Sequence, residues 1–369
     1  MTILTRTILT AVVVLGIAAR PAAASGPCTF GTLPSGAQSM ICVPPPGAWN
    51  GALVVFGHGY VPDGAGPTFA NLTLADGTSL PALVQSFGFA FATTTYRHNG
   101  LVILEAVDDM KELVAAFTAS FGRPLRTYVT GASEGGLVAA LSAEREPDLF
   151  DGALAACGPI GSFRGQVNYF GDFRVLFDYY FPNVLPGSAV GVPAALMANW
   201  ETQFKPAVIA ALAANPARTI ELLRVALAPF DPAHPETAVN TVVDLLWYNV
   251  FATNDAVARL GGNPFNNRFR WYFGSSNDLL LNSRVARFSD SLVARQALRP
   301  YETSGELSIP LVSLHTLGDD VIPFGHEVVY FLKLNAAARA NFTPLPVARY
   351  GHCAFTGAEI GAAFLKMIQ

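Results

Sequence analysis

The sequence predicts an α/β fold with a mostly parallel sheet of about eight strands and helices on both faces. From residue 50 onward, short apolar runs alternate with longer helical patterns, as they do in βαβ units. The chain has 369 residues, of which 51% are hydrophobic and 14% charged, so it can bury a large core. A long helical stretch interrupts the alternation in the second half, which indicates an insertion into this core.

Residues 1–25 have the pattern of a secretory signal peptide. Arg6 supplies a positive start, residues 8–19 form the apolar stretch, and residues 22–24 are small alanines suited to cleavage. A membrane anchor is the alternative, but the apolar run is only about a dozen residues, short of the ~20 that span a bilayer. We therefore predict a secreted protein, extracellular or periplasmic, without stable membrane insertion.

Four cysteines remain after that segment: Cys28, Cys42, Cys157 and Cys353. An even number of cysteines in an exported chain favours disulfides, and four cysteines allow three connectivities. We prefer the pairs Cys28–Cys42 and Cys157–Cys353, because the first would close a hairpin whose turn is signalled at residues 34–36. Buried free thiols are the alternative.

The first half of the core supplies strands and helices in alternation. Expected strands cover 28–43 (more than one strand), 50–56, 88–96, 125–130 and 152–156. Expected helices cover 101–121 and 135–145. The first of these helices has apolar residues at helical spacing and acidic residues on the opposite face, so it should pack on the sheet.

Residues 160–308 differ from the core segments 26–159 and 309–369. They are rich in aromatics and in helical runs such as 206–214 and 217–228, and they contain little that resembles a parallel strand. We predict a helical lid or cap insertion, with a separate domain as the alternative.

The sheet pattern then resumes. The expected elements are a strand at 309–315, a helix from 324 to about 340, a strand around 346–349 and a last helix at 357–368.

The segment Gly131-Ala132-Ser133-Glu134-Gly135-Gly136 lies between a β-rich run and a helix-forming run. A G-x-S-x-G sequence in that context forms a nucleophile elbow, a tight turn that exposes the serine. Gly131 and Gly135 are needed because neighbouring backbone approaches Ser133 closely, where a Cβ would collide. Ser133 is therefore the candidate nucleophile.

With this motif the sequence resembles the α/β-hydrolase superfamily, from about residue 50 to the C-terminus except for the insertion. Gly57-His58-Gly59-Tyr60 ends the first strong strand and is similar to loops that form part of the oxyanion hole in this superfamily. The resemblance implies that the backbone N–H groups of Tyr60 and Glu134 hold the oxyanion. We expect His58 to brace the loop rather than to transfer protons.

Two further motifs complete the resemblance. Asp319-Asp320-Val321-Ile322-Pro323 follows a strand and looks like the turn that carries the catalytic acid, and its spacing selects Asp319 over Asp320. Tyr350-Gly351-His352-Cys353 follows the final strand, where the superfamily places its histidine. The order Ser133, Asp319, His352 is the order expected for this fold.

Cys353 follows the proposed histidine, as in tannases and feruloyl esterases. In that group the partner cysteine directly precedes the nucleophile, and this chain has Ala132 there. The resemblance to that group is therefore incomplete. The insertion lies where many lipases and esterases carry a lid, and its aromatics between residues 169 and 181 could line an acyl pocket or form the lid's own core.

Several classes of function lack support in the sequence. The net charge is −4 and Lys plus Arg number 23, which gives no basic footprint for nucleic acid. No H-E-x-x-H, C-x-x-C, P-loop or dinucleotide-binding motif is present, so no metal site and no cofactor is expected.

We therefore expect a secreted, lipase-like serine esterase that acts on lipophilic carboxylic esters through an acyl-enzyme. A serine peptidase is the first alternative; to grip a free amino terminus it would need carboxylates in the insertion. The available ones are Glu201, Glu221, Glu236 and Asp244. A non-catalytic binding protein on the same scaffold is the second alternative.

Overall fold

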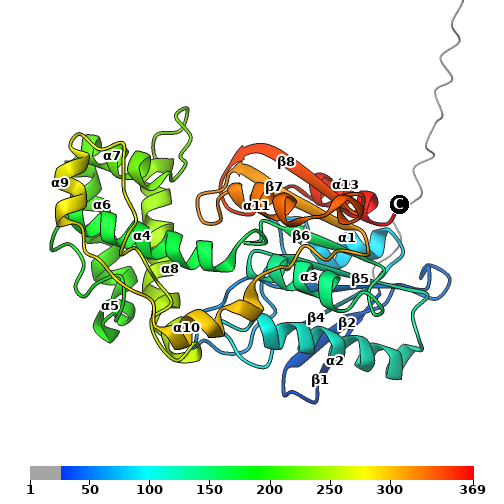
Figure 1. Ribbon diagram of the computed structural model, residues 1–369. Coiled ribbons are helices and arrows are strands. Elements are labelled where there is room, and N and C mark those ends of the chain that lie inside the picture. The colour runs from blue at the N-terminus through cyan, green and yellow to red at the C-terminus, as the bar shows by residue number, and fades with distance from the viewer. Residues whose placement is uncertain (1–25) are drawn as a thin grey trace, which may run out of the picture.

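The computed structural model describes residues 26–369, and its core is an eight-stranded sheet (Figure 1). The strand order is β1-β2-β4-β3-β5-β6-β7-β8. The pairs β1–β2 and β2–β4 are antiparallel, and all neighbours from β4 to β8 are parallel. The strands are β1 (Cys28–Thr32), β2 (Gln38–Cys42), β3 (Ala52–Gly57), β4 (Ala90–Thr94), β5 (Arg126–Ala132), β6 (Gly152–Ala156), β7 (Leu311–Gly318) and β8 (Phe342–Tyr350). The predicted fold class is confirmed.

Helices cover both faces of this sheet. On one face pack α2 (Ile103–Phe121), α3 (Glu134–Arg145) and α11 (Gly325–Lys333); on the other pack α1 (Leu80–Ser86) and α13 (Gly357–Met367). The alternation within β3 explains the two cores: Leu53 and Val55 belong to the first, while Val54 and Phe56 belong to the second. A strand buried on both faces needs such a continuous apolar run.

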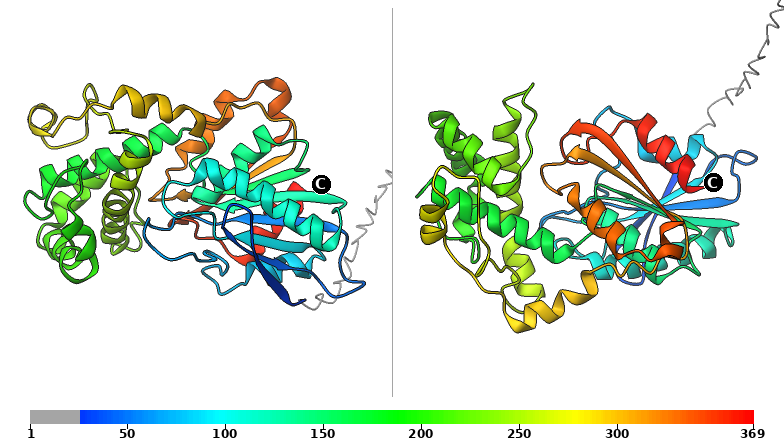
Figure 2. Two further views of the ribbon diagram at one scale, coloured as in Figure 1. Left: turned by 90° about the horizontal axis from the view of Figure 1, so that it is seen from below. Right: turned by 45° about the horizontal axis from the view of Figure 1, so that its top comes forward.

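A helical segment joins β6 to β7. Its elements are α4 (Phe163–Tyr180), α5 (Ala194–Ala198), a π-helical turn (Trp200–Phe204), α6 (Lys205–Ala214), α7 (Pro216–Ala226), α8 (Thr237–Arg259), α9 (Asp278–Arg284), α10 (Leu292–Ala297) and a 3₁₀ turn (Arg299–Tyr301). Most of these helices share an apolar core of their own, separate from the two cores at the sheet. In Figures 1 and 2 they lie beyond the end of the sheet rather than on its faces.

Two helices differ from the sequence-based expectation. Helix α1 was not predicted; it is only seven residues long, and Ser79 caps it by accepting the N–H of Ala82. The helix expected from 324 to about 340 is broken, because Leu334 adopts an extended conformation after α11. Asn335 then caps a separate short helix, α12 (Ala336–Arg339), by accepting two backbone N–H groups.

The strand expected around 346–349 is longer in the structure. It begins at Phe342 and includes Pro344 and Pro346. These prolines are tolerated because β8 is the edge strand of the sheet and need not donate every N–H to a neighbour.

Both predicted disulfides are present. Cys28–Cys42 joins the paired strands β1 and β2, and Cys157–Cys353 joins the loop after β6 to the loop after β8. The predicted signal peptide, residues 1–25, lies outside the described residues. Within residues 26–369, no helix is both long enough and apolar enough to cross a bilayer.

Candidate active site

Ser133 occupies a sharp turn between β5 and α3. Its φ of 58° is rare for a residue with a side chain, and its N–H donates to the Ala156 carbonyl. A Cβ on Gly131 would collide with the Gly135 carbonyl oxygen, and a Cβ on Gly135 would collide with that of Gly57. The turn therefore has the geometry of a nucleophile elbow, and the structure shows why these positions need glycine.

The structure brings the three predicted residues together. His352 Nε2 lies 2.8 Å from Ser133 Oγ, and His352 Nδ1 lies 2.9 Å from Asp319 Oδ2. Ser133 comes from the turn after β5, Asp319 from the loop after β7 and His352 from the loop after β8. The carboxyl ends of these parallel strands meet at one edge of the sheet, so residues far apart in sequence converge there.

Asp319, rather than Asp320, faces the histidine. Asp319 Oδ1 also accepts the N–H groups of Val321 and Ile322, at 3.0 and 2.8 Å. Burial alone would raise the pKa of Asp319, but charge interactions and hydrogen bonds with His352 and His315 hold it below its ordinary value. Asp319 is therefore a buried carboxylate oriented toward His352.

Asp320 has different partners. The Tyr350 hydroxyl donates to its Oδ2 at 3.3 Å. Burial and the carboxylates of Asp244 and Asp319 raise the pKa of Asp320 to about 7. The spacing argument that selected Asp319 thus agrees with the geometry.

The loop after β3 passes close to the serine. A Cβ on Gly59 would lie 3.1 Å from Ser133 Cβ. The Gly59 N–H donates to Asn71 Oδ1 at 2.8 Å, whereas within residues 26–369 the N–H groups of Tyr60 and Glu134 have no acceptor. First-turn N–H groups of a helix, such as that of Glu134, lack intrahelical partners. Tyr60 follows Gly59 and Glu134 follows Ser133 in the chain, so both N–H groups without an acceptor belong to residues adjacent to this close approach.

His58 is buried and braces this loop, as expected. Its Nδ1 lies 2.7 Å from the Gly59 carbonyl oxygen, and its ring stacks on Tyr96 at 4.0 Å between centroids. The Tyr96 hydroxyl donates to the His58 carbonyl. Burial lowers the pKa of His58, which favours the neutral ring.

Sequence reasoning missed the support behind Asp319. His315 is buried with Nδ1 2.9 Å from Glu327 Oε1 and Nε2 2.8 Å from the Ile322 carbonyl oxygen. Burial lowers the pKa of His315, but Asp319 and Glu327 outweigh it and raise the pKa to about 10. His315 is thus an imidazolium that links the Asp319 turn to α11.

The Cys157–Cys353 disulfide lies directly behind the histidine, with Cys353 Sγ 3.4 Å from His352 Nε2. It ties the His352 loop to the loop after β6. Cys157, His352 and Cys353 also have the proximity of metal ligands. Thiolates are the ligating form of cysteine, and both sulfurs are bonded to each other, so this cluster does not fit a metal.

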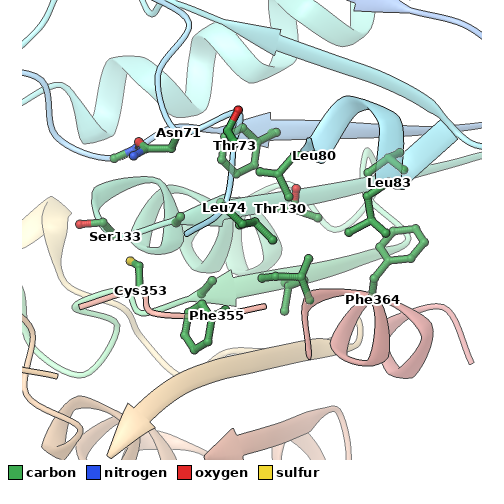
Figure 3. A pocket seen from close by; sticks show the side chains of 18 of the residues that line it. Asn71, Thr73, Leu74, Leu80, Leu83, Thr130, Ser133, Cys353, Phe355 and Phe364 are labelled. Carbon is green, nitrogen blue, oxygen red and sulfur yellow. Dashed lines mark hydrogen bonds between the residues drawn. The ribbon is translucent and has the colours of Figure 1, made fainter. Parts of the chain in front are cut away.

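A pocket of about 310 Å³ opens at Ser133 and continues between the sheet and helices α1 and α13 (Figure 3). Its mouth contains Ser133 and Cys353, and its opposite end contains Leu83 and Phe364. Within residues 26–369, no Asp, Glu, Lys or Arg side chain lines it. It is an apolar pocket built from the core itself.

A second, smaller pocket of about 100 Å³ lies between the core and helices α4 and α8. It shares Tyr60, Ser133 and Tyr248 with the first pocket. Tyr248 belongs to α8, and its ring stacks on Phe170 at 5.1 Å between centroids. No sequence motif indicated that Tyr248 would reach the serine from 115 positions along the chain.

Within the described residues, Glu134 is the one Asp, Glu, Lys or Arg residue that lines either pocket at Ser133; it lies in the wall of the smaller one. Burial raises the pKa of its carboxyl to about 8, although the Val102 N–H donates to it and opposes this effect. At neutral pH the side chain is therefore mostly uncharged. An ionised carboxylate here would oppose negative charge on a neighbouring oxyanion.

Glu134→Gln is expected to make stability less dependent on pH. The native-state pKa lies above the unfolded value of about 4.3, so the native state holds an extra proton between these values and stability falls as the pH rises through that window. In the wild type, this group should lower the free energy of unfolding by roughly 3 kcal/mol between pH 4 and pH 7, and Glu134→Gln should abolish this decrease. Urea unfolding at both pH values measures this; an unchanged pH dependence would contradict the burial argument.

The sheet order, the turn at Ser133 and the order of the converging residues define the α/β-hydrolase fold. No protein-family model and no curated protein sequence matches the chain.

Solved structures of low sequence identity resemble it. An esterase of Pyrococcus furiosus is 10% identical over 93% of this chain and 93% of its own, with a TM-score of 0.47. Feruloyl esterase B from Aspergillus oryzae is 13% identical over 88% of this chain and 74% of its own, with a TM-score of 0.45. An acylaminoacyl peptidase of Pyrococcus horikoshii is 12% identical over 93% of this chain, which spans 40% of the peptidase, with a TM-score of 0.44.

Proposed function

We propose that the protein is an exported serine hydrolase that cleaves carboxylic esters. The observation that carries this proposal is the continuous array from Ser133 Oγ through the His352 ring to Asp319, with contacts of 2.8 and 2.9 Å. Export agrees with the two disulfides, because disulfides persist in oxidising compartments. A non-catalytic role is disfavoured because each member of the array is present and oriented.

The proposed reaction has two halves. His352 Nε2 takes the proton of Ser133 as Oγ attacks the ester carbonyl, and the N–H groups of Tyr60 and Glu134 stabilise the oxyanion. His352 then gives the proton to the departing alcohol, which leaves an acyl-serine. Water, deprotonated by the same histidine, attacks the acyl-serine; as the bond to Oγ breaks, His352 returns this proton to Ser133 Oγ and the acid is released. Asp319 holds the ring and stabilises its charged form.

The pocket chemistry supports an apolar ester. The larger pocket has no charged side chain within the described residues, and Glu134 in the smaller one is mostly neutral. We assign the acyl chain to the larger pocket, because this pocket begins at Ser133, to which the acyl group becomes bonded, and has about 310 Å³ against about 100 Å³ for the smaller one. The helical segment between β6 and β7 would then act as the lid, since α4 and α8 form walls of the smaller pocket.

Leu83 is expected to set the acyl length that the larger pocket accepts. With p-nitrophenyl esters from acetate to palmitate, kcat/KM should rise about fourfold per CH₂ until the pocket is full, from ~0.8 kcal/mol per buried CH₂. Leu83→Trp should move the optimum to shorter chains and Leu83→Ala to longer ones, because Leu83 lies at the far end of the pocket.

The matched control is Leu125→Trp, at an exposed leucine that lines neither pocket. If the preferred acyl chain length were the same in both Leu83 variants as in the wild type, the acyl chain would not bind in this pocket. A shift in preference for the alcohol portion instead would show that the two portions bind the other way round. Absence of any ester turnover by the wild type would overturn the ester assignment.

A serine peptidase is the second candidate, favoured by one observation. Among the carboxylates that the sequence offered in the insertion, Asp244 of α8 approaches Asp320, and burial raises its pKa. Such a carboxyl pair could hold a substrate amino group. Turnover of aminoacyl p-nitroanilides above ester turnover, lost in Asp244→Asn, would favour the peptidase.

A further inference from the structure

The loop between α8 and α9 carries an unusual surface sequence, Arg268-Phe269-Arg270-Trp271-Tyr272-Phe273. Its aromatic side chains are far more exposed than such residues usually are: Phe269 is 90% exposed, Trp271 56% and Phe273 59%. Tyr272 points the other way and is buried, with its hydroxyl donating to Asp172 at 2.6 Å. The loop is therefore anchored by one aromatic residue and presents three others to solvent.

The exposed aromatics continue into a wider apolar surface. Trp271 and Phe273 line a groove of about 440 Å³ together with Leu227 from the end of α7 and Val329 from α11. Leu227 is 70% exposed and Val329 42%. We call Leu227, Phe269, Trp271, Phe273 and Val329 the aromatic patch. Contiguous exposed apolar surface of this kind marks interaction sites.

Arginines accompany this patch. Arg268 lies over the Phe269 ring at 5.2 Å and Arg287 over the Tyr272 ring at 5.3 Å. The Arg287 guanidinium donates to the carbonyl oxygens of Asn267, Arg270 and Asn282, and Arg270 pairs with Asp172 at 2.7 Å. Within residues 26–369, the Arg268 guanidinium has no ion-pair or hydrogen-bond partner. The chain as a whole has a net charge of −4, so unpaired positive charge beside exposed aromatics is a local feature.

We propose that the aromatic patch and Arg268 dock the protein onto the surface of an anionic lipid bilayer. Aromatic side chains favour the membrane–water interface, and arginines near it are attracted to anionic headgroups. The unpaired charge of Arg268, next to the exposed Phe269 ring, favours this partner over a neutral apolar surface. The residues involved line neither pocket at Ser133, so this docking is independent of the catalytic proposal.

The test is co-sedimentation of the full mature chain with vesicles of phosphatidylcholine alone or mixed with phosphatidylglycerol. We expect binding to the mixed vesicles that weakens with added salt. Phe269→Ser/Trp271→Ser/Phe273→Ser should weaken it at least tenfold, and Arg268→Ser about fivefold at low salt. The matched controls are Leu125→Ser and Arg123→Ser, at exposed positions beside α2.

Each variant is first checked for wild-type circular dichroism and for wild-type turnover of a soluble short-chain ester, or of the best soluble substrate found. Equal binding to both kinds of vesicle, no binding to either, or equal loss in the control variants would overturn the proposal. Concentration-dependent dimerisation that disappears in the triple serine variant would also overturn it, because the patch would then be an interface between copies.

Discussion

Ser133→Ala is expected to lower kcat for ester hydrolysis by several orders of magnitude, about 10⁶-fold where triad enzymes have been dissected. The substitution removes the only atom that the proposed mechanism uses to form the acyl-enzyme, and it leaves the oxyanion donors in place. Hydrolysis of a p-nitrophenyl ester by purified mature protein measures it. His352→Ala should cost a similar factor, and the double variant little more, because the two residues act as one unit.

Folding must be separated from catalysis in this comparison. Alanine removes one oxygen from a buried turn whose shape is set by Gly131 and Gly135, so Ser133→Ala should keep the wild-type circular dichroism spectrum. A folded variant with wild-type turnover would mean that Ser133 is not the nucleophile.

Asp319→Asn is expected to lower kcat by about 10⁴-fold, the cost of the corresponding change in a serine protease. The amide would donate where the carboxylate accepts from His352 Nδ1, and would favour the wrong tautomer of the ring. It would also weaken the contact with the charged His315. Turnover of the same ester, with the protein shown to be folded, measures this effect.

Asp320→Asn is the matched control, since it makes the same chemical change one residue away. Asp320 accepts from the Tyr350 hydroxyl and already has a raised pKa of about 7, so its amide should cost less than about tenfold in kcat. If Asp320→Asn caused the large loss of kcat and Asp319→Asn the small one, the choice of Asp319 as the orienting acid would be wrong.

The strands and main helices of the core could be predicted from the sequence, because apolar runs and helical spacing of apolar residues coincide with them. β6 was predicted with the bounds that the structure shows, and the other core strands shifted by a few residues. Ser133, Asp319 and His352 could be named because each follows a strand at a position that the fold brings to one edge of the sheet. The Cys28–Cys42 disulfide was predicted from the turn signal between the two cysteines.

The remaining site residues could not be named because packing alone positions them. Asn71 accepts the Gly59 N–H from an irregular loop, which has no sequence pattern to identify it. Tyr248 lies in the middle of α8 and lines both pockets with Ser133. In the sequence, an aromatic residue at helical spacing there cannot be distinguished from one in the hydrophobic core. The larger pocket depends on how α1 and α13 sit on the sheet, and α1 itself was too short to give a periodic signal.

The most direct test of the central claim is covalent labelling with a fluorophosphonate, followed by peptide mapping by mass spectrometry. Such a reagent reacts with a serine only when a neighbouring base and oxyanion donors activate it. The account predicts one adduct per chain, on Ser133, with labelling and ester turnover lost in parallel and no adduct in Ser133→Ala. Labelling of another residue, or full ester turnover without labelling of Ser133, would contradict it.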